Sequence, residues 1–253
     1  MKSAARWIML VLVAALALEA FFIVRIAMAA TLAPESTAFM RSEAWRIATT
    51  KGRLAWSHQW VPYDRISDNL KRAVIASEDD SFNVHDGYDW EALEKAWQRN
   101  AQAEERAARQ RPRTAPSSNA APASARTVRP PRVIGGSTIT QQLAKNLLLS
   151  GERTFLRKGQ EFVLTFALEK MLSKRRILEI YLNSVEWGEG VFGAEAAARH
   201  YFRKSASQLT AYEAARLAVM LPRPKYFEKV PGSGYLSSRA GTIAARMRGA
   251  ELP

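Results

Sequence analysis

An apolar segment near the start constrains this chain most. It runs from Trp7 to Ala30 and is broken only by Glu19 and Arg25. About 20 apolar residues cross a bilayer as a helix, so the stretch from Trp7 to Val24 is long enough to span, with Arg25 reaching the interface beyond it. The sequence therefore predicts an anchoring helix followed by a domain outside the bilayer.

The flanks of this segment predict its orientation. Lys2 and Arg6 precede it, and because positive residues stay on the cytoplasmic side, everything after about residue 30 is expected on the outer side. Residues 27–29 read Ala-Met-Ala, which also fits the cleavage site of a signal peptide. The two alternatives differ in whether the exported domain stays tethered to the membrane.

Composition limits the partners and the chemistry. The chain has 253 residues, of which 47% are hydrophobic, enough for one sizeable core, and its net charge of +13 favours anionic partners. It contains no cysteine, which excludes disulfides, thiolate metal sites and cysteine nucleophiles. Because the chain is expected to be exported, phosphates and anionic lipids are preferred over nucleic acid as partners.

The pattern after the apolar segment is helical. No stretch alternates convincingly enough to predict a sheet, so the expected class is mainly α. We expect a cytoplasmic tip and anchor (1–30), a membrane-proximal lead-in (31–65), a main domain (66–226) and a basic tail (227–253) to which we assign no function.

One segment inside the main domain is not expected to fold. Residues 107–132 contain five prolines and six arginines, no acid, and Val128 as their one large apolar residue. Such a segment cannot bury enough apolar surface to offset the entropy of ordering. We predict a disordered basic loop that is dispensable for chemistry and attracts anionic lipid.

A glycine-led helix is the first candidate binding element. Gly135 and Gly136 precede Ser137, which is a good N-cap for a helix that starts at Thr138. A helix N-terminus flanked by polar donors suits a phosphate, although an ordinary amphipathic helix with a glycine hinge would give the same pattern. On a helical wheel one polar wedge contains Thr138, Gln141, Gln142, Lys145 and Asn146.

Two acids flank that element in the sequence. Asp68 is expected to cap a helix that ends in Glu78-Asp79-Asp80, where carboxylates oppose the helix dipole, so function explains them better than stability. Glu161 lies in a helix over 155–172 that is apolar all round and expected to be buried; its alternative role is a structural pair with Arg157. Paired carboxylates suit glycosyl chemistry, and a phosphate site would favour transfer over hydrolysis.

Four further elements complete the expected helical domain. They are a helix from Asp89 to about Arg106, a helix over Lys174–Asn183 capped by Ser173, a glycine-rich turn at 186–190 leading to a helix through Phe202, and a helix to Leu221 that opens with a Thr210–Glu213 capping box.

Five groups of residues occur in order over about 66–224. They are Glu78-Asp79 with Phe82, His85, Gly87 and Asp89; Gly135 to Asn146; Arg157-Lys158 with Glu161; Lys174 with Ile177-Leu178 and Tyr181-Leu182-Asn183; and Tyr201-Phe202 with Leu209-Thr210 and Glu213. These groups resemble the motifs of the peptidoglycan glycosyltransferases, specifically the monofunctional biosynthetic transglycosylases of Gram-negative bacteria. The loop at 107–132 is longer than this family leads us to expect, but it leaves the motifs intact.

The resemblance implies a lysozyme-like, two-lobed fold. It also implies an enzyme that polymerises lipid II, an undecaprenyl-pyrophosphoryl disaccharide-pentapeptide, into β-1,4-linked glycan at the outer face of the inner membrane. Glu78 would be the base that deprotonates the acceptor hydroxyl. Glu161 would help the pyrophosphate to leave, directly or through a divalent metal, Mg²⁺ or Mn²⁺. The substrate-binding candidates are Ser137, Thr138, Gln141, Gln142, Lys145, Arg153, Arg157 and Lys158.

The expected partners are lipid II, the growing glycan strand and inner-membrane lipid, with proteins of cell-wall synthesis or division as further candidates. The chain has neither a Ser-x-x-Lys nor a Lys-Thr-Gly motif, so no transpeptidase is expected. Two other classes stay open. A lysozyme-like hydrolase would need an acid catalyst but no phosphate-binding helix, and a non-catalytic anchored basic protein would need neither Glu78 nor Glu161.

Overall fold

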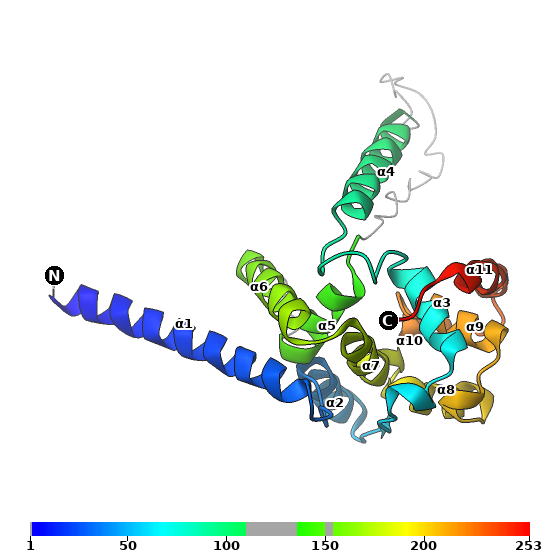
Figure 1. The fold of residues 1–253 in the computed structure, drawn as a ribbon, viewed down its shortest axis with the longest axis horizontal. Coiled ribbons are helices and arrows are strands. Elements are labelled where there is room, and N and C mark those ends of the chain that lie inside the picture. The colour runs from blue at the N-terminus through cyan, green and yellow to red at the C-terminus, as the bar shows by residue number, and fades with distance from the viewer. Residues whose placement is uncertain (1, 110–135, 150–153) are drawn as a thin grey trace, which may run out of the picture. The chain divides into compact units, whose positions relative to one another are not determined.

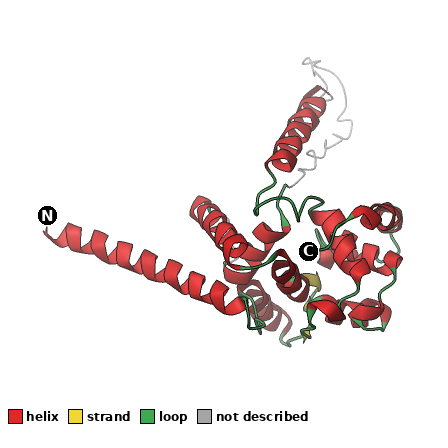
Figure 2. Cartoon of the chain, in the orientation of Figure 1, coloured by secondary structure: helices red, strands yellow, loops and turns green. Residues whose placement is uncertain are grey.

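The computed structural model describes residues 2–109, 136–149 and 154–253, and these form helices with one small sheet (Figures 1 and 2). The predicted mainly α class is confirmed. The chain divides into two compact units, one made of Met1–Gly87 with Thr138–Pro253 and the other of Tyr88–Ser137. Arg153 and residues 110–132 of the predicted loop lie outside the described residues.

The first unit contains the anchor and most of the folded domain. Its elements are α1 (Lys2–Ala29), α2 (Ala38–Lys51), β1 (Ser57–His58), η1 (Tyr63–Arg65), α3 (Asp68–Glu78), α5 (Ile139–Leu148), α6 (Phe155–Met171), α7 (Lys174–Ser184), β2 (Glu186–Gly188), β3 (Val191–Phe192), α8 (Ala194–Phe202), η2 (Ala206–Gln208), α9 (Ala211–Met220), α10 (Pro224–Phe227), α11 (Gly234–Arg246) and η3 (Met247–Gly249), where η marks a 3₁₀ helix.

Helix α1 is apolar along almost its whole length. Residues Ser3–Ala29 are long and apolar enough to cross a membrane, a test that a signal sequence also passes. The Arg176 side chain on α7 donates from Nε to the carbonyl of Ala29 and from Nη2 to that of Leu32, both at 2.8 Å. A cation at a helix C-terminus satisfies orphan carbonyls and complements the helix dipole, so α7 fixes the end of α1.

The expected lead-in and tail both pack into the fold. Helix α2 lies within the lead-in, buries Met40 and Ile47, and packs against α5. Helix α11 lies within the tail and packs against α9 and α3. The sequence predicts a membrane-proximal lead-in and a basic tail, and in the structure each of these segments also supplies buried side chains to the core.

A three-stranded sheet joins the predicted glycine-rich turn at 186–190 to a strand from the lead-in, where we expected no sheet. The strand order is β1-β3-β2, with β1 parallel and β2 antiparallel to β3. Strands of two or three residues are too short for alternation to be recognised, which explains why they were missed. Gly190 has φ +77°, and a Cβ there would lie 2.1 Å from the carbonyl oxygen of Ala55, so this turn requires glycine.

The prediction that α6 is buried all round is wrong. Leu164 and Leu168 are fully buried, whereas Phe162, Val163 and Phe166 are each about half exposed. Helix α6 packs against α5 on one side and α1 on another. An all-apolar helix is typical of a protein core or a membrane boundary, and α6 has a buried side and an apolar exposed side.

The observed helix starts agree with those predicted from the sequence to within one residue. Ser173 and Thr210 are N-caps as predicted, and Thr210 forms its capping box with Glu213. The predicted cap Asp68 is wrong by one position, because Ser67 caps α3 and Asp68 is its first residue. Serine accepts well from the next turn, and two adjacent capping residues cannot be ranked from sequence alone.

The second unit is built around α4 (Trp90–Arg109). The helix begins one residue after the predicted Asp89, whose Oδ1 accepts from the backbone N–H of Ala92 at 2.7 Å. The helix extends three residues beyond the expected Arg106. The rings of Tyr88 and Trp90 stack with centroids 5.6 Å apart.

We predict that Ile243→Ala in α11 lowers the free energy of unfolding by about 2–4 kcal/mol, because Ile243 is fully buried and truncation leaves a cavity. Urea denaturation of the detergent-solubilised chain, followed by tryptophan fluorescence, measures this change. The neighbouring Thr242 is exposed, so Thr242→Ala is the control and should change stability by less than about 0.5 kcal/mol. Equal effects would show that the tail is not part of the core.

Candidate active site

The carboxylate of Asp79 joins the end of α3 to the start of α5. Its Oδ2 accepts from the backbone N–H of Ile139 at 2.9 Å, and its Oδ1 lies 2.8 Å from Nε2 of His85. Nδ1 of His85 accepts from the N–H of Gly87 at 3.1 Å, so Nε2 carries the proton that faces Asp79. The anion at the N-terminus of α5 is therefore one of the protein's own carboxylates.

The structure corrects the predicted N-cap of this helix, whereas its role in binding a phosphate stays a prediction. Thr138, not Ser137, is the N-cap, and it forms a capping box with Gln141. The Thr138 hydroxyl also donates to the carbonyl of Gly87 at 2.7 Å. Both side chains are buried in the cap, so Thr138 and Gln141 have structural contacts instead of the predicted substrate-facing position. Ser137 is exposed and belongs to the second unit.

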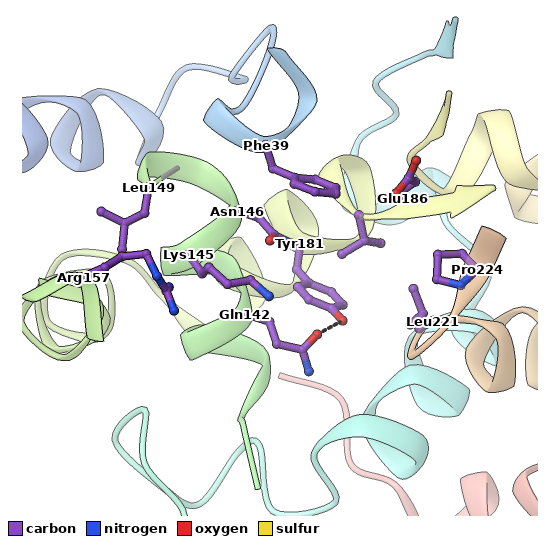
Figure 3. Close-up of a pocket in the computed structure, with 11 residues that line it drawn as sticks. Phe39, Gln142, Lys145, Asn146, Leu149, Arg157, Tyr181, Glu186, Leu221 and Pro224 are labelled. Carbon is purple, nitrogen blue, oxygen red and sulfur yellow. Dashed lines mark hydrogen bonds between the residues drawn. The ribbon is translucent and has the colours of Figure 1, made fainter. Parts of the chain in front are cut away.

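The rest of the polar wedge does reach a pocket of about 390 Å³ (Figure 3). Gln142, Lys145 and Asn146 enter from α5, Arg157 from α6, and Tyr181 from α7. Among the described residues, the lining consists of Phe39, Gln142, Lys145, Asn146, Leu149, Arg157, Tyr181, Val185, Glu186, Leu221 and Pro224.

Glu78 meets this pocket through Gln142. Its Oε2 accepts from Nε2 of Gln142 at 3.0 Å, and Oε1 of Gln142 accepts from the Tyr181 hydroxyl at 2.9 Å. Burial raises the pKa of the Glu78 carboxyl; the Gln142 hydrogen bond lowers it and the charge of Asp79 raises it by smaller amounts. Burial, followed by the charges of Glu78 and Asp79, raises the pKa of Tyr181, which keeps its hydroxyl a donor.

Glu161 meets the pocket through Arg157. The structure forms the Arg157–Glu161 pair at 3.0 Å and adds Lys158 at 2.5 Å to the other carboxylate oxygen. Glu161 is buried, Arg157 is mostly buried, and Lys158 is largely exposed. Both predicted acids therefore lie one contact behind the pocket lining.

Glu186 is a pocket carboxylate that our sequence analysis did not select. It is 8% exposed, and Nζ of Lys225 lies 3.3 Å from its Oε1 and 2.5 Å from Oε2 of Glu43. Burial raises the pKa of Glu186 to about 7, opposed by Lys225. The signal in the sequence is a carboxylate between Val185 and Trp187, both of which are buried.

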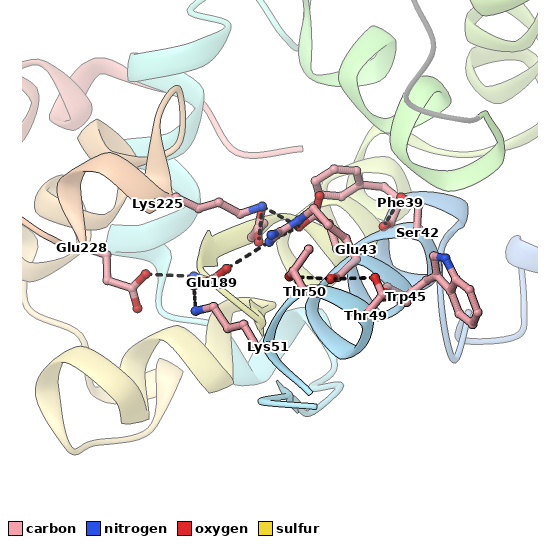
Figure 4. A network of polar contacts seen from close by, with 12 residues as sticks. Phe39, Ser42, Glu43, Trp45, Thr49, Thr50, Lys51, Glu189, Lys225 and Glu228 are labelled. Atoms are coloured by element: carbon pink, nitrogen blue, oxygen red, sulfur yellow. Dashed lines mark hydrogen bonds and ion pairs between the residues drawn. The ribbon is translucent and has the colours of Figure 1, made fainter. Parts of the chain in front are cut away.

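An ion-pair network holds this side of the pocket together (Figure 4). Lys225 of α10 pairs with Glu43 of α2, and Arg46 of α2 pairs with both Glu43 and Glu189. Lys51 also pairs with Glu189, whose backbone N–H donates to Glu228 at 2.9 Å. The network thereby ties α2 to the β2–β3 turn and to α10.

Comparison with known proteins identifies the family. The family model described as Transglycosylase matches residues 46–109 and 118–248, which is most of the chain. The chain belongs to the transglycosylase family. Its helical, lysozyme-like fold is that of the family's catalytic domain.

Named relatives cover nearly the whole length. A biosynthetic peptidoglycan transglycosylase of Paraburkholderia xenovorans (strain LB400) is 51% identical over 243 residues, 96% of this chain and 90% of the relative. Proteins of the same name from Paraburkholderia phytofirmans (strain DSM 17436 / LMG 22146 / PsJN) and Burkholderia ambifaria (strain MC40-6) are each 50% identical, covering 98% and 94% of this chain and 94% and 86% of the relatives. The family match includes the end of α2, residues 46–51, and all of α11.

We predict that Asp79→Asn lowers the free energy of unfolding by about 2–3 kcal/mol. An amide offers one acceptor oxygen, so either the Ile139 N–H or His85 loses a charge-assisted partner in a buried place. Urea denaturation measures the change. Asp80→Asn is the matched control, because Asp80 forms an exposed pair with Arg246 that contributes little. If the two variants were equally stable, Asp79 would not hold α3 to α5.

We predict that Glu186→Gln makes stability less sensitive to pH. Between the unfolded pKa of 4.5 and the folded value of about 7, the folded state binds a proton that the unfolded state has lost, so stability falls as pH rises. The Gln variant should gain roughly 2–3 kcal/mol over the parent between pH 5 and pH 8.

Glu189→Gln is the control for this prediction. Hydrogen bonds from Lys51 and Arg46 lower the pKa of Glu189 in the folded state, so its contribution is already complete at pH 5 and stays constant to pH 8. Denaturant titrations at the two pH values measure both differences. A Glu186→Gln difference that does not change with pH would contradict the prediction.

Proposed function

We propose that this transglycosylase polymerises lipid II into β-1,4-linked glycan strands, with inversion and release of undecaprenyl pyrophosphate, and without transpeptidase activity. One observation carries the proposal: Gln142, a lining residue of the pocket, holds Glu78, while Lys145 and Arg157 line the same pocket. One cavity is thus lined by the residue that holds the candidate base and by the candidate cations for the leaving group. The curated relatives named biosynthetic peptidoglycan transglycosylases supply the substrate class.

Glu78 is the proposed general base. Its raised pKa makes it a stronger proton acceptor than an ordinary glutamate, and Gln142 fixes one of its oxygens. The proton of the acceptor sugar's 4-hydroxyl moves to Glu78 while that oxygen bonds to the donor's anomeric carbon. The bond from that carbon to the pyrophosphate oxygen breaks, and attack from the opposite face inverts the configuration.

Lys145 and Arg157 are the proposed groups that stabilise the departing pyrophosphate. Charge-assisted hydrogen bonds to phosphate oxygens are among the strongest in proteins. Glu161 accepts from Arg157 and Lys158, so it acts as a positioning residue for these cations. This role makes Glu161 an indirect aid to pyrophosphate departure.

The predicted Mg²⁺ or Mn²⁺ does not fit the residues around Glu161. Within residues 2–109, 136–149 and 154–253, no group of three His, Asp or Glu side chains is arranged to hold a metal, and both oxygens of Glu161 face cations. We therefore assign no step of the reaction to a metal. That the rate depends on added Mg²⁺ or Mn²⁺ stays a prediction from the sequence, and a chelator titration tests it.

The proposed location is the bacterial inner membrane, with α1 as a single-pass anchor and the catalytic domain in the periplasm. The positive flank of α1 supports this orientation. The exposed apolar side chains of α6, which packs beside α1, support contact with lipid. The proposed partners are lipid II, the growing strand and membrane lipid, and association with proteins of cell-wall synthesis or division stays a prediction.

A paired assay tests the function. The purified full chain is given labelled lipid II in one arm and purified sacculi in the other. We expect chains to lengthen from lipid II and no soluble muropeptides to appear from sacculi. Release of muropeptides without polymerisation would identify a hydrolase, and inactivity in both arms would favour a non-catalytic anchored protein.

We predict that Glu78→Gln lowers the polymerisation rate at least about 100-fold, because the amide cannot accept the acceptor's proton. The fold should persist, since Gln142 can still hydrogen-bond to the new side chain. Asp80→Asn, which removes a nearby exposed carboxylate, should retain the parent rate. A folded Glu78→Gln protein with near-normal turnover would refute the assignment of the base.

A further inference from the structure

A second pocket of about 530 Å³ lies at the C-terminal end of α1. Its walls come from α1, from the connection between α1 and α2, from α2 and from α5. Phe21, Met28 and Leu147 give it apolar sides. It shares no lining residue with the pocket that Gln142 and Lys145 line.

Two arginines face this second pocket. The guanidinium of Arg25 lies 5.9 Å from the ring centroid of Phe21, and Nη1 of Arg41 donates to the carbonyl and hydroxyl of Ser36, both at 3.2 Å. Glu35 also lines the pocket, yet neither arginine forms an ion pair with a carboxylate in the part of the chain that the structure describes. The described lining therefore has two positive charges and one negative charge, and neither positive charge is paired with a carboxylate there.

The two positive charges lie close enough to affect each other. Burial, and after it the charge of Arg25, lowers the pKa of the Arg41 guanidinium. Like charges in a partly desolvated site repel, and an anion between them would turn that repulsion into two attractions. A phosphate suits the place because guanidinium groups bind its oxygens through paired hydrogen bonds.

The position of Arg25 along α1 indicates where that phosphate comes from. Arg6, the last residue of the cytoplasmic flank, lies 19 residues before Arg25, so the helix rises about 29 Å between them. This length matches the roughly 30 Å hydrocarbon core of a bilayer. With Lys2 and Arg6 on the cytoplasmic side, Arg25 lies at the level of the phosphates of the outer leaflet.

We propose that this pocket binds an anionic phospholipid of the outer leaflet, with its phosphate between Arg25 and Arg41 and an acyl chain against Phe21 and Leu147. The proposal rests on the membrane orientation given under the proposed function. It does not use the donor's pyrophosphate, for which Lys145 and Arg157 line a separate pocket. The bound lipid would join α1, α2 and α5.

Lipid binding to the intact chain tests this site. The detergent-solubilised protein is titrated with phosphatidylglycerol, and native mass spectrometry counts the bound lipid and gives its Kd. We expect one tightly bound lipid per chain. Arg25→Gln and Arg41→Gln should each weaken it about tenfold, which corresponds to about 1.4 kcal/mol for one lost charge-assisted contact. Phosphatidylcholine should bind more weakly, because its ammonium group cancels the phosphate charge.

Two matched variants separate local binding from net charge. Arg239→Gln removes an exposed positive charge from α11 and should leave the Kd unchanged. Glu35→Gln removes the one carboxylate of the lining and should tighten binding two- to fivefold. Arg41 lies outside the apolar span, so Arg41→Gln carries the test even where Arg25→Gln impairs insertion.

Three results would overturn the site: the same Kd for Arg41→Gln as for the parent, equal weakening by Arg239→Gln, or arginine-dependent binding of undecaprenyl pyrophosphate in preference to phosphatidylglycerol. The last would assign the pocket to the carrier lipid. The outcome is independent of turnover. Arginine-dependent lipid binding by a chain that does not polymerise lipid II would refute the proposed activity alone.

Discussion

The contact between the Asp79 carboxylate and the first turn of α5 is the interaction on which the site depends. Asp79 sits directly after Glu78 and accepts from Ile139, three residues before Gln142. Fixing that one hydrogen bond brings the candidate base and the amide that orients it to the same place. His85 holds the other oxygen, so the loop after α3 is ordered by the same carboxylate.

The sequence predicted well what depends on spacing within one helix. Gln142, Lys145 and Asn146 share a wedge of α5, and all three line the pocket. The same wheel could not separate them from Thr138 and Gln141, because capping and ligand binding favour the same polar side chains. Thr138 and Gln141 form the cap, while the carboxylate of Asp79, about 60 positions earlier in the chain, occupies the N-terminus of α5.

What sequence reasoning missed depends on contacts between distant segments. Phe39 and Glu186 line the pocket, and the network through Lys225 that joins their elements spans α2, the β-hairpin and α10. Phe39 has no local pattern that marks it, and Glu186 has only its place between Val185 and Trp187, since each pairs with a partner far away in the chain. The same holds for α11, whose buried side chains make sense only against α9 and α3.

The firm attachment of α1 determines how substrate and product move. Eight residues, 30–37, separate α1 from α2, and Arg176 holds the carbonyl of Ala29 at the end of α1 and that of Leu32 within this connection. Phe39, in the first turn of α2, already forms a wall of the candidate catalytic pocket. In the membrane location proposed above, with α1 in the bilayer, the pocket stays at a fixed height, within about 30 Å of chain from the surface. In that location a lipid-linked sugar arrives by diffusion in two dimensions, and the growing polymer slides past an enzyme that stays at the membrane.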